Sequence, residues 1–186
     1  MTVIISAHER HKLVTLYLLR HAKSSQATGG LNDEDRPLNE RGRTAAAALG
    51  RYMHDHGLCP DLVLSSSARR TRETLEILRA AAAWGPANPP ERFLDRLYLA
   101  PPADILAAIT AVAEPVQSIL VVGHNPGIHE LALAVVTRGQ DDYANLLDAY
   151  PTGALAVLTS DAAAWPGFAN APISLAAFVR PRDLIA

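Results

Sequence analysis

The sequence predicts a three-layer α/β/α sandwich with a largely parallel central sheet. Continuous apolar runs of strand length alternate along the chain with alanine-rich segments of helical periodicity. The runs show little polar alternation, which is typical of strands that are covered on both faces. A chain of 186 residues, 49% of them hydrophobic, suits one domain with a substantial core.

The first predicted strand and helix begin this alternation. LVTLYLL at 13–19 is a continuous apolar run and predicts a buried strand. The alanine-rich segment 39–57 predicts a helix, with Asn39 as its N-cap and Leu38 as the apolar staple residue before it. Gly57 marks the end of this helix.

Two further strands follow, each leading into a helix. DLVLSS at 61–66 predicts the second strand, and 68–83 predicts a helix with leucines and alanines behind a charged first turn. PADILAAITAVA at 102–113 predicts a shorter helix. SILVVG at 118–123 predicts the third strand, and the helix predicted over 126–139 opens on a proline and closes on a glycine.

The last part of the chain predicts two more strands, ALAVLTS at 154–160 and SLAAFVR at 174–180. The segments 84–91 and 162–172 contain proline and glycine and predict loops inside the domain. Neither segment has the features of a domain boundary.

We expect a single domain over residues 13–186, preceded by an N-terminal extension over residues 1–12. His8 and His11 in that extension have a spacing found in metal sites, but no further ligands accompany them, so we expect a solvated segment. Nothing near the start resembles a signal peptide, and no segment approaches the ~20 apolar residues that span a bilayer. These features predict a cytoplasmic protein without a membrane partner.

The charge balance bears on the partners. The chain has 17 Lys and Arg residues and 19 Asp and Glu residues, which gives a formal net charge of −2. We therefore expect no nucleic-acid partner, and any recognition of anions must be local. Cys59 is the only cysteine, which excludes an intramolecular disulfide and fits a reducing compartment.

Histidines and arginines follow three of the predicted strands. The first strand leads into Arg20 and His21, the second into the three arginines of SSSARRTRET, and the third into His124. In an open α/β sheet, ligands bind at the carboxyl ends of the strands, where helix N-termini favour anions. Arginine forks match phosphate oxygens, and a neutral imidazole is a competent nucleophile near pH 7. The pattern predicts a phosphoryl site.

The polar residues next to these positions do not all need a role in binding phosphate. Arg69 and Arg72 are expected to be solvated or paired with glutamates on the predicted helix, with a place at the mouth of the pocket as the alternative. For Lys23, Ser24 and Ser25, two alternatives stay open: they cradle phosphate, or they only start the loop after the strand.

Five motifs stand in order along the chain: LYLLRHAKSS, DRPLNERG, LVLSSSARRTRETLE, LVVGHNPG and YPTGALAVL. Together they resemble the histidine phosphatase superfamily, also called the phosphoglycerate-mutase-like family, and within it the small bacterial phosphohistidine phosphatases of the SixA type. The resemblance covers most of residues 15–182 and implies the phosphoglycerate-mutase-like fold.

The resemblance implies roles for individual residues. The family's phosphorylated histidine falls on His21 and its adjacent phosphate-binding arginine on Arg20. The second arginine, in an R-x-x-[QE]-T pattern, falls on Arg70, and the second histidine falls on His124. Backbone N–H groups near Asn125 are expected to join these side chains in binding the phosphoryl group.

A second family pattern and two departures complete the comparison. In RPLNERG, matches to a pattern at the rim of the site make Arg36 and Asn39 candidate contacts. The family's usual motif R-H-G reads Arg20-His21-Ala22 here, so Ala22 stands where the family usually has glycine, as is common in the SixA-like branch. The general-acid glutamate of the mutases and larger acid phosphatases has no clear match, and Asp95 is the nearest candidate.

We therefore expect a metal-independent phosphatase that works through a phosphohistidine intermediate on His21. The arginines supply the charge that Mg²⁺ would otherwise supply, so no cofactor is expected. An alkoxide leaving group needs a proton from a positioned acid, whereas an imidazole can leave as a neutral ring. The missing acid thus favours a P–N substrate, and a phosphohistidine protein is the expected partner.

Two alternatives stay open at this point. The first is a phosphatase of small phosphate esters; a mutase is disfavoured because the chain is short and lacks the acid glutamate. The second is a non-catalytic module that binds a phosphorylated ligand. Retention of both histidines argues against the second alternative, because a binding module has no need of a nucleophile.

Overall fold

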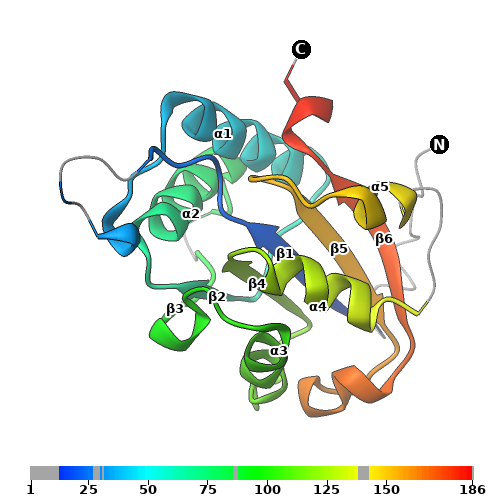
Figure 1. Ribbon diagram of the computed structural model, residues 1–186. Coiled ribbons are helices and arrows are strands. Elements are labelled where there is room, and N and C mark those ends of the chain that lie inside the picture. Colours follow the sequence, from blue (N-terminus) through cyan, green and yellow to red (C-terminus); the bar gives the residue numbers. More distant parts are fainter. Residues whose placement is uncertain (1–12, 27–29, 31, 86–87, 138–142, 186) are drawn as a thin grey trace.

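The computed structural model describes residues 13–26, 30, 32–85, 88–137 and 143–185. A six-stranded sheet in the order β3-β2-β4-β1-β5-β6 runs through it (Figure 1). The strands are β1 (Val14–Arg20), β2 (Leu62–Ser66), β3 (Glu91–Leu94), β4 (Ser118–Gly123), β5 (Leu155–Ser160) and β6 (Ile173–Val179).

The sheet is largely parallel, as predicted. The neighbours β1 and β4, β4 and β2, and β2 and β3 all pair in parallel. Strand β5 runs the opposite way and pairs antiparallel with both β1 and β6. Strand β5 is therefore the single reversed strand in the described sheet.

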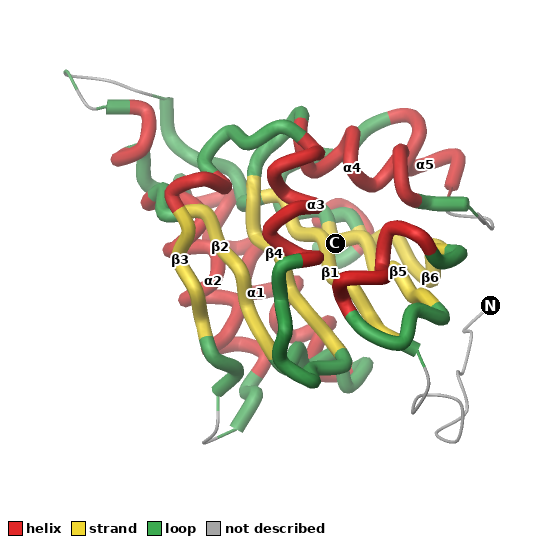
Figure 2. Tube along the Cα trace, turned by 90° about the horizontal axis from the view of Figure 1, so that it is seen from below, coloured by secondary structure: helices red, strands yellow, loops and turns green. Residues whose placement is uncertain are grey.

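Helices cover both faces of the sheet. Helices α1 (Glu40–Asp55) and α2 (Arg69–Ala82) pack together on one face. Helices α3 (Pro102–Thr110), α4 (Gly127–Val135) and α5 (Tyr143–Asp148) lie on the other face (Figures 1 and 2). This arrangement confirms the predicted three-layer sandwich.

Strand β1 shows why its sequence is apolar from Leu16 to Leu19. Leu16 and Leu18 face the core formed with α3 and α4, whereas Tyr17 and Leu19 face the core formed with α1 and α2. A central strand buried on both faces needs apolar residues at every position. The strand therefore holds the residues at its carboxyl end rigidly.

The start of α1 follows the sequence prediction. The side chain of Asn39 accepts a hydrogen bond from the backbone N–H of Gly42 at 2.9 Å, as an N-cap does. Leu38 before it is buried, and Gly57 after the helix has a φ of 63°. Such a positive φ favours glycine and stops the helix.

The structure differs from the sequence prediction in a few elements. The apolar pattern does not predict β3, because this edge strand is only partly buried and has no continuous apolar run, nor does it predict α5. The predicted loop at 162–172 contains a 3₁₀ helix, Trp165–Asn170, whose Trp165 packs in the core. Helix α4 ends at Val135, short of the predicted end at 139, and residues 138 and 139 lie outside the described part.

The predicted extension over residues 1–12, including His8 and His11, lies outside the described residues. Within the described part of the chain, no helix has the length and apolar character needed to cross a bilayer.

Candidate active site

The candidate site lies at the carboxyl ends of β2, β4 and β1, which are neighbours in the sheet. A cavity of about 580 Å³ opens at this edge. Its lining includes every residue that the sequence predicts for the site: Arg20, His21, Ser24, Arg70, His124 and Asn125. Residues that are more than a hundred positions apart in the chain, such as Arg20 and Asn125, thus share one cavity because parallel strands end at the same edge.

His21 follows β1 directly and is buried, with 8% of its surface exposed. Its Nδ1 lies 2.7 Å from the carbonyl oxygen of Ala22. Because a carbonyl only accepts hydrogen bonds, Nδ1 carries the proton and the lone pair of Nε2 stays free. Burial lowers the pKa of His21 from 6.5 to about 4; the hydrogen bond to Ala22 opposes this shift, and the charges of Arg70 and Arg20 add to it. At neutral pH, His21 is an uncharged imidazole with a free nitrogen, the form that a nucleophile needs.

His124 follows β4 and lies beside His21, with ring centroids 5.1 Å apart. Its Nδ1 lies 3.2 Å from Nη2 of Arg70, and its Nε2 lies 2.8 Å from Oγ of Ser66. A guanidinium only donates, so Nδ1 accepts and Nε2 donates to Ser66. Burial lowers the pKa of His124 to about 3, and two smaller causes act in the same direction: the repulsion that a protonated His124 would meet from a protonated His21, and the charge of Arg70. His124 is therefore neutral in this structure.

Arg20 ends β1 and reaches across the site. Its Nη1 donates to the main-chain carbonyl of Tyr150 at 2.7 Å. Its Nε is buried and has no hydrogen-bond partner among the described residues. A buried N–H without an acceptor is costly, so this donor is suited to an acceptor supplied by a ligand. Arg20 lines the same cavity as His21, so such an acceptor would lie near the imidazole of His21.

The guanidinium of Arg70 forms an ion pair with the carboxylate of Asp33. Nη2 of Arg70 lies 3.0 Å from Oδ2 of Asp33, and Nη1 donates to the main-chain carbonyl of Asp33 at 2.6 Å. The hydroxyl of Tyr98 also donates to Oδ2 at 2.6 Å, and Arg36 donates to Oδ1 at 2.6 Å. The hydrogen bonds from Tyr98 and Arg36 hold the pKa of Asp33 well below its ordinary value. Asp33 is thus an anion at neutral pH, and it competes with any phosphoryl oxygen for Nη2 of Arg70.

Asp33 and Tyr98 are the two residues of this network that the sequence does not predict. Asp33 stands in the acidic run DED, which has the composition of a solvated turn, and Tyr98 stands in FLDRLYLA. Neither residue lies at a predicted strand end. The candidate contact Arg36 does line the cavity and also donates to Oγ of Ser24 at 3.0 Å.

The side chain of Asn125 is oriented by Tyr150. Its Nδ2 donates to the carbonyl of Tyr150 at 3.1 Å, whereas its Oδ1 is buried without a partner among the described residues. An acceptor oxygen repels phosphoryl oxygens. The side chain of Asn125 therefore suits a donor group of a ligand, and its backbone N–H stays the predicted contact to phosphate. The other candidate contact, Asn39, uses its side-chain oxygen to cap α1.

Helix α2 holds the two loops that carry these residues. The carboxylate of Glu73 accepts from the backbone N–H of Leu38 at 2.8 Å. Oγ1 of Thr74 accepts from the backbone N–H of Ala22 at 3.0 Å and donates to the carbonyl of Arg70 at 2.6 Å. The glutamate and threonine that follow Arg70 in the sequence motif thus fix the loops around His21.

Three residues lie away from the site. Arg69 pairs with Glu73, with Nε 2.7 Å from the carboxylate, and Arg72 stacks over the ring of Phe93 at 3.9 Å. Both line a separate cavity together with Asp95. The structure therefore does not bring Asp95 beside His21, where a general acid would have to stand.

The site cavity carries an excess of positive charge. Four cationic side chains, those of Arg20, Lys23, Arg36 and Arg70, line it, and Asp33 is the single acidic one among the described residues. In the described part of the chain, no group of three or more His, Cys, Asp and Glu side chains could hold a metal ion.

The sequence of this chain is similar to those of known proteins. Residues 16–97 match the sequence model of the histidine phosphatase superfamily, branch 1. An uncharacterized protein of Mycobacterium tuberculosis is 35% identical over 143 residues, which cover 75% of this chain and 85% of that protein. The fold and these matches define the protein as a phosphatase, a hydrolase of phosphorylated compounds.

Two solved structures are similar over nearly their whole length. A protein of Nakamurella multipartitia assigned as a phosphohistidine phosphatase SixA is 31% identical, with a TM-score of 0.78, covering 94% of this chain and 98% of that one. A protein of Agrobacterium tumefaciens with the same assignment is 33% identical, with a TM-score of 0.75, covering 90% and 98%. The chain belongs to the histidine phosphatase superfamily, in its SixA-type branch.

Proposed function

We propose that this phosphatase removes the phosphoryl group from phosphohistidine on a protein, through a phosphohistidine intermediate on His21 and without a metal. The observation that carries the proposal is the state of His21. It is a neutral imidazole whose Nε2 is free, in a cavity that it shares with Arg20 and Arg70. The SixA assignment of the two similar structures supports the choice of substrate.

The reaction has two displacements. In the first, Nε2 of His21 attacks phosphorus, the bond from phosphorus to the substrate nitrogen breaks, and the substrate imidazole leaves with that electron pair. A ring that is protonated on its other nitrogen leaves as neutral imidazole. In the second, water attacks the phosphorus on His21, and inorganic phosphate and free His21 are formed. Both steps depend on positioning and on the stabilisation of charge.

The arginines stabilise the phosphoryl oxygens. The buried Nε of Arg20 lacks an acceptor among the described residues, so a phosphoryl oxygen would satisfy it. Arg70 becomes available when Asp33 moves from it. A bound phosphoryl dianion would also raise the pKa of His124, because a nearby negative charge favours the protonated ring. His124 could then donate from Nδ1 in place of accepting there from Arg70.

The acidic groups near the site favour a P–N substrate. Asp95 lines a different cavity, and Asp33 is held ionised by Tyr98 and Arg36, so neither is placed to give a proton to an alkoxide. A general acid contributes roughly 10²–10⁴ in rate to the cleavage of an alkyl phosphate. A neutral imidazole leaving group does not require that contribution.

The intermediate can be tested directly. Incubation with a labelled phosphoramidate should give a phosphoprotein that is labile in acid and stable in base. His21→Ala should incorporate no label, and His56→Ala, at an exposed position at the end of α1, should incorporate as much as the wild type. Equal labelling of wild type and His21→Ala would show that the nucleophile is another residue. No label and no turnover on any donor would favour a binding module.

The substrate class needs a second measurement. We expect a higher kcat/KM for a phosphohistidine protein than for sugar phosphates or an aryl phosphate, all compared at the same pH. A preference for sugar phosphates would contradict the substrate proposal and leave the nucleophile and the fold unaffected.

A further inference from the structure

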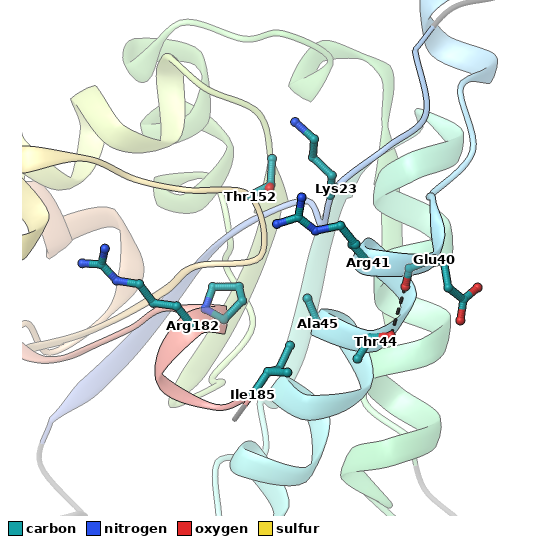
Figure 3. A pocket seen from close by; sticks show the side chains of 9 residues that line it. Lys23, Glu40, Arg41, Thr44, Ala45, Thr152, Arg182 and Ile185 are labelled. Carbon is teal, nitrogen blue, oxygen red and sulfur yellow. Dashed lines mark hydrogen bonds between the residues drawn. The ribbon is translucent and has the colours of Figure 1, made fainter.

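A second cavity of about 500 Å³ adjoins the active-site cavity. The two share Lys23 and Thr152 in their linings, so they form a continuous surface. We call the second cavity the basic groove; the cations Lys23, Arg41 and Arg182 line it. Figure 3 shows Lys23 and Arg41 beside Thr152, with Arg182 across the groove from them.

The cations of the basic groove have little internal neutralisation. Lys23 and Arg41 make no side-chain hydrogen bond or ion pair with any described residue. Arg182 is highly exposed, at 70%, and its nearest carboxylate, that of Asp183, lies 4.0 Å away. That carboxylate is already bound by Arg180 at 2.8 Å. The positive charge of the groove is therefore open to an external anion.

Among the described residues, the single acidic one that lines the groove does not neutralise it. The side chain of Glu40 extends away from the three cations in Figure 3, and its backbone carbonyl accepts from Oγ1 of Thr44. Arg41 lies in the first turn of α1, where the helix dipole disfavours a cation. A residue that is unfavourable for its own helix is the kind of local conflict found at functional sites.

The floor of the groove is apolar. Ala45, Pro181 and Ile185 line it, and Ile185 is 40% exposed. A phosphoryl group fills only a small part of the active-site cavity, which at about 580 Å³ lies in the range of pockets that hold a whole small-molecule ligand, roughly 300–1,000 Å³. Two adjoining cavities with cations above an aliphatic floor suit an extended segment that carries carboxylates.

We propose that the basic groove binds acidic side chains that flank the phosphorylated histidine of a protein substrate. This inference rests on the proposed function, because it requires the phosphoryl group to lie beside His21 while the flanking segment crosses Lys23. The contact is between exposed charges, so it is screened by salt. It gives the enzyme a preference among phosphohistidine proteins that the catalytic residues by themselves do not supply.

Matched peptides test the groove. Two phosphohistidine peptides differ only in two positions beside the phosphohistidine, which are Asp in one and Asn in the other. The wild type should show a kcat/KM roughly tenfold higher for the Asp peptide at low ionic strength, and this ratio should fall as salt is added. The double variant Arg41→Glu, Arg182→Glu should lose or reverse the preference. Arg51→Glu, an exposed change on the same helix outside the groove, should keep it.

The possible results of the peptide experiment separate the groove proposal from the proposed function. Turnover of both peptides with equal kcat/KM by the wild type would overturn the groove proposal and leave the proposed function in place. Failure to hydrolyse either peptide would instead count against the proposed function. A preference retained in the double variant would place the recognition elsewhere. A dependence on Arg41 and Arg182 seen only with small bisphosphorylated compounds would replace the protein segment by a small molecule and overturn the proposal.

Discussion

At the scale of single residues, the two histidines differ in which nitrogen is free. His21 donates from Nδ1 to a carbonyl and keeps Nε2 unprotonated, whereas His124 accepts at Nδ1 and donates from Nε2. The assignment follows from the partners, because a carbonyl only accepts and an arginine only donates. The two rings thus carry their proton on different nitrogens before any substrate binds.

The depressed pKa of His21 predicts its titration. Because the folded-state pKa of about 4 lies below the ordinary 6.5, His21 stays neutral as the pH falls through 6.5 and becomes charged only near pH 4. We expect its ring resonances, assigned by comparison with His21→Gln, to stay constant in NMR spectra from pH 7.5 to about 5. A midpoint near 6.5 would contradict the burial of this ring as the cause of its neutral state.

The contact between Asp33 and Arg70 predicts tighter binding of product when the carboxylate is removed. In Asp33→Asn, inorganic phosphate no longer competes with an anion for Arg70, so its inhibition constant should fall roughly threefold to tenfold. Tyr98→Phe is the control, because it removes one hydrogen bond to Asp33 and keeps the charge. A higher inhibition constant in Asp33→Asn would mean that Asp33 positions Arg70 for phosphate.

At the scale of elements, the sequence motifs correspond to contacts between segments. Helix α2 holds the loop after β1 through Thr74 and the loop before α1 through Glu73. Helix α1 approaches the loop after β1 through Gly42, where a Cβ would overlap the carbonyl oxygen of Lys23. These close contacts explain why the positions that matter in the sequence lie near strand ends and helix starts.

Gly42→Ala should therefore destabilise the fold and perturb the site. The added methyl group must displace α1 or the backbone of Lys23, and overpacking of this kind costs about 1–3 kcal/mol. We expect urea unfolding to show that loss in the free energy of unfolding, together with a lower kcat/KM. Gly167→Ala is the control, because a Cβ at Gly167 meets no atom within 4 Å. Equal stability of the two variants would show that the loop at Lys23 yields without cost.

At the scale of the whole molecule, Tyr150 joins distant parts of the chain. Its buried hydroxyl donates to the carbonyl of Leu18 on β1 at 2.6 Å and accepts from the backbone N–H of Ala156 on β5 at 3.0 Å. Its own carbonyl binds both Arg20 and Asn125. One residue thus links the pairing of β1 and β5 to the placement of two site residues.

Tyr150→Phe should reduce stability by about 2 kcal/mol, since two buried backbone groups lose their partner. Chemical denaturation of this variant beside Tyr143→Phe measures the effect, because the hydroxyl of Tyr143 has no hydrogen bond with the described residues. Equal losses in the two variants would mean that water or backbone pairing replaces the Tyr150 hydroxyl.

Much of the fold could be predicted because it depends on local patterns. The apolar runs of β1, β2 and β4 are continuous since these strands are covered on both faces. The cap at Asn39 is a local hydrogen bond and was visible in the sequence for that reason. Two elements depend on packing against distant residues, so no local sequence pattern predicts them: the half-buried edge strand β3 and the 3₁₀ helix at Trp165.

The sequence by itself determined the layer architecture and the meeting of Arg20, His21, Arg70 and His124 at one edge, because parallel strands bring their carboxyl ends together. Only the tertiary structure decided which nitrogen of His21 is free, that Asp33 occupies Arg70, and that Lys23, Arg41 and Arg182 line one groove. These features join loops and helix ends that have no shared period in the sequence. Their positions follow from how the layers pack, so they become visible only when the chain is folded.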